Sequence, residues 1–337
     1  MICKLCPRQC GVERSEYSPA GVCASPALPR IARAAAHFGE EPCISGEKGS
    51  GTVFFSGCNL KCVFCQNHEI SRGRVGKTVS VERLRDIFLE LQDEGVHNIN
   101  LVTPTHYTDA IVKALEKARL RIPVAWNSSG YDSVEALKRL DGLVQIYMPD
   151  FKYADSELAR RYSAAPDYPE AAKAAIREMY RQTGPFVLDD DGMLQKGVLI
   201  RHLILPEAEQ NSRAAIDFVA DNFPGERVLF SLMAQFTPMP GTEKYPELQK
   251  TVSQELNERL IDYMLCRGIE YLAAGTGHGV SARSAVADGA SLANGADFAR
   301  CLFENFVVIH DVSSCAYLLL IIYVRRRSDQ SPVSCHP

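Results

Sequence analysis

Three cysteines, Cys58, Cys62 and Cys65, stand close together on a short stretch of glycine and polar residues. They follow the apolar run 53–55, which is typical of a strand. Three thiolates cannot complete the four sulfur ligands of an iron–sulfur cubane or a closed zinc site, so one metal corner is left for another ligand. A structural zinc site and three thiols packed in a core are the alternatives. The C-x3-C-x2-C spacing on a loop favours metal ligation.

The stretch from Gly57 to Asn67, GCNLKCVFCQN, resembles the cluster loop of the radical S-adenosylmethionine (SAM) superfamily. The resemblance implies that the three cysteines bind a [4Fe–4S] cluster whose open iron is chelated by SAM. Phe64 would pack near the adenine. An electron from the reduced cluster would cleave SAM to methionine and a 5′-deoxyadenosyl radical, which abstracts a substrate hydrogen. Cluster and SAM would carry the chemistry, and the protein would direct it.

A second cysteine group lies at the N-terminus, where short segments with proline and glycine separate Cys3, Cys6, Cys10 and Cys23. Four sulfurs could close a tetrahedral zinc site or hold an accessory iron–sulfur cluster. A set of reduced surface thiols is the alternative. We therefore expect a second metal here, and the sequence does not choose between zinc and iron.

The chain has 337 residues, a net charge of −4 and twelve cysteines. Its length suits one barrel-sized domain with appendages, and its charge gives no electrostatic footprint for nucleic acid. The start lacks signal-peptide features, and the longest uncharged apolar stretch, 316–324, is far shorter than the ~20 residues of a membrane span. We expect a cytoplasmic protein with reduced thiols that binds neither nucleic acid nor membrane.

From about residue 52 the sequence alternates strand-like and helix-like segments, which predicts a parallel sheet with crossover helices. Strands are expected over 52–56, 98–103, 122–126, 143–148, 198–205 and 227–232. Helices are expected over 81–94, 107–119, 133–140, 211–222 and 245–267. Ser80 should cap the first helix, and Pro166 and Pro169 should divide the helical region 156–182 in two. Six such units fit an α/β fold of the radical SAM kind, an incomplete TIM-type (β/α)6 barrel.

Three regions are expected along the chain. They are a Cys-rich N-terminal extension at 1–50, a radical SAM partial barrel at 51–272, and an atypical C-terminal tail at 273–337. The tail begins rich in glycine, alanine and serine and later shows an apolar run followed by three arginines, which departs from the family pattern. A reading-frame change or a lineage-specific extension would explain it.

Polar residues follow the predicted strands, where barrels of this kind place their chemistry. After the second strand, Thr103 and Thr105 stand where superfamily members commonly carry a turn that contacts the SAM amino group, and their oxygens could accept its hydrogens. Alternatively, Thr105 only caps a helix, and His106 is a solvated or capping group rather than a catalyst. After the third strand, Asn127 and Ser129 could bond a ribose or a carboxylate, or form a capped turn.

After the fourth strand, Asp150 and Lys152 resemble the Asp-x-Lys element that positions SAM in glycyl-radical-enzyme activases; a surface ion pair is the alternative. In the fifth strand, Arg201 and His202 interrupt an apolar run and must point to opposite faces. We expect Arg201 to face the barrel interior and meet the SAM carboxylate or an acidic substrate. The candidate catalytic residues are Arg201 and Lys152, and the candidate cofactor contacts are Phe64, Thr103, Thr105, Asn127, Ser129, Asp150 and Lys152.

Combined with CKLCPRQC at 3–10, NINLVTPTHY at 98–107 and IRHLILP at 200–206, these motifs resemble proteins similar to pyruvate formate-lyase activating enzyme, often labelled PflX-like. The resemblance covers about residues 1–265. It implies hydrogen abstraction from a protein or peptide glycine, with a reductase such as flavodoxin or ferredoxin as electron donor. The alternatives are radical modification of another peptide or small molecule and a non-catalytic iron–sulfur or zinc scaffold. Polar groups on several strand ends favour a catalyst.

Overall fold

A nine-stranded sheet organises the part of the chain that the computed structural model describes, residues 2–72, 75–225 and 227–269. Its strands are β1 (Arg30–His37), β2 (Ser50–Phe55), β3 (Lys77–Thr78), β4 (Ile99–Val102), β5 (Val124–Ser128), β6 (Ile146–Pro149), β7 (Val187–Leu188), β8 (Leu194–Leu203) and β9 (Leu229–Met233). The order is β3-β1-β2-β4-β5-β6-β8-β7, and β9 pairs with β8. The tail predicted at 273–337 lies outside the described residues.

The sheet is mostly parallel and, within the described ranges, does not close. Strands β2, β4, β5, β6, β8 and β9 pair with one another in parallel, whereas β1, β3 and β7 join antiparallel. The fold is therefore a partial TIM-type barrel of the expected α/β class. β1 falls within the segment expected as an extension, yet it pairs with β2 along its length.

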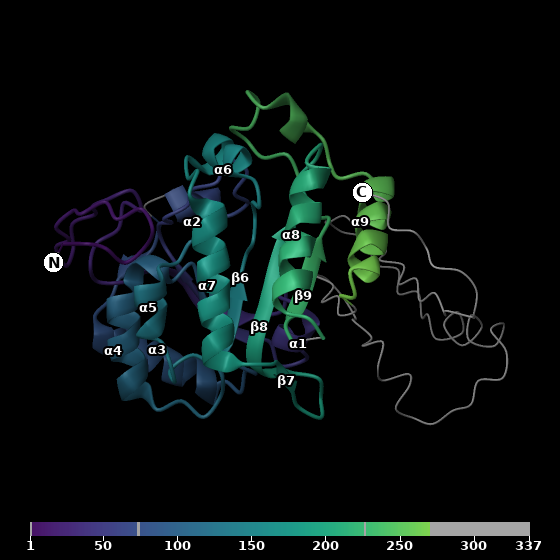
Figure 1. Cartoon of the computed structure of the whole chain (residues 1–337). Coiled ribbons are helices and arrows are strands. Elements are labelled where there is room, and N and C mark those ends of the chain that lie inside the picture. The colour runs from purple at the N-terminus through teal and green to yellow at the C-terminus, as the bar shows by residue number, and fades with distance from the viewer. Residues whose placement is uncertain (1, 73–74, 226, 270–337) are drawn as a thin grey trace, which may run out of the picture. The chain divides into compact units, whose positions relative to one another are not determined.

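Helices connect the parallel strands. The α-helices are α1 (Pro42–Ser45), α2 (His68–Arg72), α3 (Val81–Asp93), α4 (Thr108–Ala118), α5 (Val134–Lys138), α6 (Ser156–Ser163), α7 (Tyr168–Thr183), α8 (Glu209–Asn222) and α9 (Gln254–Cys266). The 3-10 helices are η1 (Thr105–Tyr107) and η2 (Pro246–Gln249). Figure 1 shows α7 and α8 lying over β6, β8 and β9. No helix in the described ranges is long and apolar enough to cross a membrane.

Most predicted elements are confirmed. Each of the six predicted strands has its counterpart among the six parallel strands. Ser80 caps α3, because its Oγ accepts the N–H of Arg83 over 3.1 Å. The helical region 156–182 divides into α6 and α7, and Pro169 lies in the first turn of α7, where its missing N–H costs nothing.

One helix prediction is wrong, because 245–267 is not continuous. The chain forms the short η2 and leaves it, and α9 begins only after Ser253, whose Oγ accepts the N–H of Leu256 over 3.2 Å. The β-branched and hydroxyl residues at 251–253 disfavour a helix interior and favour a cap. The sequence also gave no signal for β1, which is rich in alanine, or for the two-residue strands β3 and β7.

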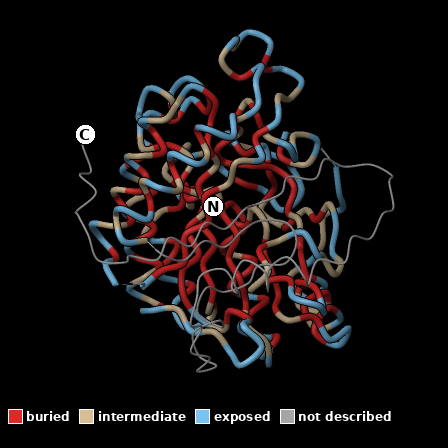
Figure 2. Tube along the Cα trace, turned by 90° about the vertical axis from the view of Figure 1, so that its right-hand side faces the viewer, coloured by how far each residue is buried: buried red, intermediate tan, exposed pale blue. Residues whose placement is uncertain are grey.

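The two faces of the sheet differ because side chains alternate along each strand. The outer face packs on the helices and carries most of the apolar core, including Leu101, Trp126 and Tyr147. The inner face holds a smaller apolar cluster of Ile44, Ala125, Ile146, Met148, Leu194, Leu199 and Leu229. Ile44 belongs to α1, so α1 covers part of the inner face. Figure 2 shows buried residues gathered toward the middle of the described chain and exposed residues mostly at its periphery.

Candidate active site

The three cysteines of the predicted cluster loop lie on the turn after β2. Cys58 and Cys62 are buried and Cys65 is half-buried. The backbone N–H of Leu60 donates to Cys58 Sγ over 3.4 Å, and Ser71 Oγ donates to Cys65 Sγ over 3.3 Å. Burial raises the pKa of the Cys58 thiol to about 12, and the neighbouring Cys62 and Cys65 raise it further. Cys58 therefore lies close to the other two thiols, in a setting that favours its own neutral form.

The N-terminal segment packs against this loop. Arg8 Nε donates to the carbonyl oxygen of Asn59 over 3.0 Å, and Arg8 Nη2 donates to that of Ser163 at the end of α6 over 2.7 Å. Gly57 has a φ of +88°, and a Cβ there would collide with Ser25 Oγ and the Cys23 carbonyl. Only glycine suits this close approach. The N-terminal segment therefore fixes the position of the cysteine loop.

Phe64 lies inside an aromatic cluster. Its ring centroid is 6.2 Å from that of Tyr153, 6.1 Å from Tyr162 and 5.8 Å from Phe236, all in edge-on geometry. These contacts tie the cysteine loop to the segments after β6 and β9. A contact between Phe64 and adenine stays a prediction.

Arg201 forms the centre of a polar group on the inner face, which we call the inner network: Glu40, Glu41, Asn100, Asn127, Asp150, Lys152 and Arg201. Arg201 Nε donates to Asp150 Oδ1 over 2.9 Å and Nη1 to Glu40 Oε2 over 3.0 Å, while Nη2 donates to Asn127 Oδ1 over 2.6 Å. Lys152 Nζ donates to Asp150 Oδ2 over 2.5 Å. The structure thus brings together Asn127, Asp150, Lys152 and Arg201, which the sequence had singled out separately.

Electrostatics in this network favour charged side chains. Burial by itself would raise the pKa of Asp150, but Arg201 and Lys152 together hold it below its ordinary value. Burial would lower the pKa of Lys152, but Asp150 and the Cys62 thiol raise it. The Lys152 ammonium in turn opposes the increase in the pKa of Cys62 that burial causes. Lys152 therefore links the inner network electrostatically to the cysteine loop.

Sequence reasoning missed Glu40 and Glu41, which follow β1. Glu40 Oε1 accepts from Asn100 Nδ2 over 3.2 Å and from Asn127 Nδ2 over 3.3 Å. Glu41 is buried, and its Oε2 lies 3.9 Å from Arg201 Nη1 without a hydrogen-bond partner. Their segment was expected to be an extension, and no local pattern marks two adjacent glutamates as interior. The charged Arg201 in an apolar strand was the available signal, because it requires a buried partner.

Thr103 and Ser129 lie beyond the ends of neighbouring strands. Thr103 has a φ of +58°, and its N–H donates to the carbonyl of Asn127 over 2.8 Å. Ser129 Oγ is buried without a hydrogen-bond partner, whereas its carbonyl accepts from Tyr168 Oη over 2.9 Å. The unpaired hydroxyl leaves Ser129 available to a bound molecule. Roles for both residues in SAM binding stay predictions.

Thr105 and His106 point away from the inner network. Thr105 Oγ1 donates to Asp132 Oδ1 over 2.7 Å on the outer side of the sheet. His106 Nε2 lies 2.9 Å from the Ser56 carbonyl, to which it must donate, and burial lowers the pKa of His106 to about 3. A buried, neutral imidazole held by the backbone is a structural group. The structure does not bring Thr105 together with the other predicted SAM contacts.

His202 likewise faces outward, opposite to Arg201. Its Nδ1 lies 2.6 Å from the carbonyl of Phe151 and its Nε2 lies 2.9 Å from Ser212 Oγ on α8. Burial lowers the pKa of His202 to about 4, so the ring is neutral at ordinary pH. The alternation expected for the fifth strand therefore separates a charged inner side chain from a structural outer one.

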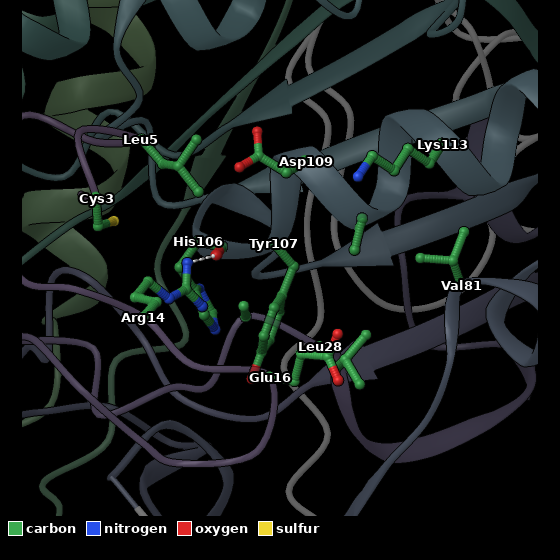
Figure 3. Close-up of a pocket in the computed structure, with 12 residues that line it drawn as sticks. Cys3, Leu5, Arg14, Glu16, Leu28, Val81, His106, Tyr107, Asp109 and Lys113 are labelled. Atoms are coloured by element: carbon green, nitrogen blue, oxygen red, sulfur yellow. Dashed lines mark hydrogen bonds between the residues drawn. The ribbon is translucent and has the colours of Figure 1, made fainter. Parts of the chain in front are cut away.

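A separate cavity of about 170 Å³ lies between the N-terminal segment and α4. Figure 3 shows its walls, which include Leu5, Leu28 and Val81, and the hydrogen bond from Arg14 to the His106 carbonyl. His106 separates the cavity from the backbone of the cysteine loop. None of the predicted SAM contacts lines this cavity.

The four N-terminal cysteines differ in burial, and Cys6 lies near Cys3 and Cys23. Cys3, Cys6 and Cys23 are buried and Cys10 is half-buried. Burial raises the pKa of Cys6 to about 11, and nearby Cys23 and Cys3 raise it further. Within the described ranges, no three histidine, cysteine or acidic side chains are arranged to hold one metal ion.

Comparison with known proteins identifies the family to which part of this chain is similar. The model of the radical SAM superfamily matches residues 52–189. This stretch is a radical SAM domain. The chain is also 29% identical over 236 residues to uncharacterized protein MJ0674 of Methanocaldococcus jannaschii. This match covers 67% of this chain and 64% of that protein, so the chain spans less than two thirds of the length of MJ0674.

Solved structures with similar architecture include Streptococcus suis SuiB bound to S-adenosylmethionine, at 16% identity and a TM-score of 0.41, covering 68% of this chain and 46% of SuiB. A domain of pyruvate-formate lyase-activating enzyme from Bacteroides vulgatus is 15% identical with a TM-score of 0.33, covering 58% of this chain and 91% of that domain. TM-scores this low do not define a function.

A radical SAM domain implies a [4Fe–4S] cluster and SAM, and the residues present fit both. The cysteine loop supplies three thiols next to an N–H and a hydroxyl donor, which suit cluster sulfurs. Each cysteine ligand of a cubane binds a different iron, so the three thiols need not converge on one point. Positive charge from iron would offset the burial that keeps Cys58 protonated. The Lys152 ammonium, which interacts with Cys62, and the unpaired Ser129 hydroxyl offer donors to a carboxylate or ribose.

Proposed function

We propose that this radical SAM enzyme removes a hydrogen atom from a glycine of a protein or peptide, as in the activation of a glycyl-radical enzyme. The cysteine loop beside Lys152 carries the proposal, because it combines the thiols for a cluster with a cation next to them. When bound, the cluster and SAM supply an electron and a 5′-deoxyadenosyl radical.

The inner network supports a positioning role for Arg201. All three of its nitrogen groups donate to side chains of the protein, so it orients Asp150 and Asn127 instead of meeting the reacting atoms. Asp150 in turn orients Lys152. We propose Lys152, Ser129 and Thr103 as the polar contacts to SAM, with Phe64 near the adenine. A small reductase such as flavodoxin or ferredoxin would deliver the electron.

Anaerobic reconstitution with iron and sulfide tests the radical chemistry. We expect an electron paramagnetic resonance signal of a reduced [4Fe–4S] cluster that shifts when SAM is added, together with 5′-deoxyadenosine formation. Cys62→Ala should abolish both while the barrel stays folded, because the ligand lies on a loop. Cys266→Ala, at an exposed position on α9, is the matched control. A signal indifferent to SAM would favour the non-catalytic scaffold.

A second experiment tests the substrate. The reconstituted protein, SAM and reductant are incubated with the glycyl-radical enzymes of the same organism, and a backbone glycyl radical is sought by electron paramagnetic resonance. A genome without any glycyl-radical enzyme would contradict activation and leave another peptide or a small molecule as substrate.

We also propose that Cys3, Cys6, Cys10 and Cys23 bind a second metal, zinc or an iron–sulfur cluster. Burial of three of these thiols and the electrostatic proximity of Cys6 to Cys3 and Cys23 support it. Metal analysis of the purified protein should show metal beyond the cluster, and Cys23→Ser should remove it while Cys266→Ser does not. Equal metal content in both variants would contradict the second site.

A further inference from the structure

Two oxygens of the inner network are buried without a hydrogen-bond partner. They are Glu41 Oε2 and Asn100 Oδ1, on residues that are 3% and 0% exposed. The orientation of the Asn100 amide is fixed, because its Nδ2 donates to Glu40 Oε1, which can only accept. Buried acceptors are normally paired, so both oxygens point to a donor that lies outside the described residues 2–72, 75–225 and 227–269.

The charges of the network are also unbalanced. Three carboxylates share two cations: Arg201 pairs closely with Asp150 and Glu40, and Lys152 pairs with Asp150. Glu41 Oε2 lies farther from Arg201 Nη1, at 3.9 Å. Burial raises the pKa of Glu41, and Glu40 and Asp150 raise it further, while Arg201 lowers it. Burial therefore favours the neutral form of Glu41, and a further cation beside it would favour the carboxylate.

Solvent exposure within the inner network is lowest at Glu41 and increases toward Lys152. Side-chain exposure rises from 3% at Glu41 and 11% at Glu40 to 13% at Arg201. It reaches 15% at Asp150 and 18% at Lys152, the residue that interacts with Cys62. The most exposed member of the network is thus the residue that interacts with the cysteine loop.

We propose that Glu41 sets substrate specificity by accepting hydrogen bonds from a cationic nitrogen, a primary ammonium or a guanidinium, with Asn100 Oδ1 as the second acceptor. This inference rests on the proposed function, since it requires the substrate to enter between the cysteine loop and the inner face. A bound ammonium would favour the carboxylate form of Glu41, and the event is binding only, with no bond to carbon changed. An acidic substrate is disfavoured, because Arg201 is already neutralised.

The test uses the reconstituted holoenzyme and three probes with three carbons each: propylammonium, propionate and propanamide. Ligand-observed NMR should detect binding of propylammonium only. A blocked Gly-Lys-Gly peptide, added in a parallel arm, should bind more tightly than propylammonium if the cation belongs to a peptide, and more weakly if it belongs to a small amine. Equal or stronger binding of propionate would overturn the inference.

Glu41→Gln should weaken propylammonium binding at least tenfold, and Glu41→Asp, which keeps the carboxylate, should restore part of it. Glu47→Gln, at an exposed position six residues further on, should bind like the wild type. Equal binding by the wild type and Glu41→Gln would overturn the inference. If Glu41→Gln does not fold, the preference of the wild type among the three probes still decides.

The wild type also separates this inference from the proposed function. SAM cleavage without any preference for propylammonium overturns the role of Glu41 and leaves the radical chemistry in place. Selective propylammonium binding by a protein that never cleaves SAM contradicts the proposed function and supports the cation site.

Discussion

Two buried polar groups lie at the same ends of β4 and β5, yet one is closed and the other is open. In the closed group, the Asp132 cluster, Asp132 Oδ1 accepts from Thr105 Oγ1 over 2.7 Å and from Trp126 Nε1 over 3.3 Å, and Oδ2 accepts from Ser128 Oγ over 2.5 Å. Both carboxylate oxygens are occupied. The inner network, in contrast, leaves buried acceptors on Glu41 and Asn100 unpaired.

The difference follows from alternation along β5. Trp126 and Ser128 point outward to the Asp132 cluster, whereas Asn127 between them points inward to Arg201. A polar residue at the end of a barrel strand is therefore not enough to indicate chemistry. The hydrogen bonds of the Asp132 carboxylate are all made to protein groups, whereas the inner network leaves two buried acceptors without a partner among the described residues.

The largest expected effect is on the inner network. Arg201→Met leaves Glu40 and Asp150 buried without their common partner, which should lower the free energy of unfolding by about 3–5 kcal/mol. Urea denaturation measures it. Arg139→Met, which breaks an ion pair with Asp109 on a more exposed surface, should cost less than about 1 kcal/mol. Equal losses in the two variants would mean that the inner network is not a coupled, buried group.

Asp132→Ala should destabilise the protein by about 1–3 kcal/mol, because Thr105, Trp126 and Ser128 lose their acceptor. The rate of 5′-deoxyadenosine formation per folded molecule should stay unchanged, since the Asp132 cluster lies on the outer face of the sheet, toward the helices. Urea denaturation and product analysis measure the two quantities. Loss of SAM cleavage in the folded variant would show that the outer cluster takes part in the chemistry.

Thr105→Val and Ser129→Ala should give opposite results. Thr105→Val removes a donor from Asp132 and should cost about 1 kcal/mol of stability without changing the KM for SAM. Ser129→Ala removes an unpaired hydroxyl, so stability should change by less than about 0.5 kcal/mol. Its KM for SAM should rise several-fold. An increased KM in Thr105→Val with none in Ser129→Ala would contradict both the structural role of Thr105 and the proposed SAM contact of Ser129.

The smallest effect concerns pH. Burial raises the pKa of Asp132 above its ordinary 3.8, so the folded state keeps the proton longer, and wild-type stability falls as pH rises from about 3.8 to the folded pKa. Asp150 has its pKa lowered, so its contribution is lost as pH falls below about 3.8.

Asp132→Asn and Asp150→Asn should therefore change the pH dependence of the unfolding free energy in opposite directions. Each slope is at most about 1.4 kcal/mol per pH unit. Urea denaturation of both variants between pH 3 and 7 measures them. A change of the same sign in both variants would contradict the electrostatic difference between the two groups.

The sequence by itself determined the local features of this protein. The C-x3-C-x2-C loop, the six parallel strands and the opposite orientation of Arg201 and His202 depend on short-range spacing and alternation, which the sequence displays directly. The prediction of one continuous helix over 245–267 was wrong, because Ser253 caps a separate helix that begins after it.

Only the tertiary structure decided which polar residues meet. Glu40 is 161 residues from Arg201 in sequence, yet their side chains form an ion pair on the inner face. Thr105 is two residues from Thr103, yet its hydroxyl turns outward to Asp132. Pairing of distant segments follows from the curvature of the whole sheet and from the packing of α1 on its inner face, and no local pattern in the sequence encodes it.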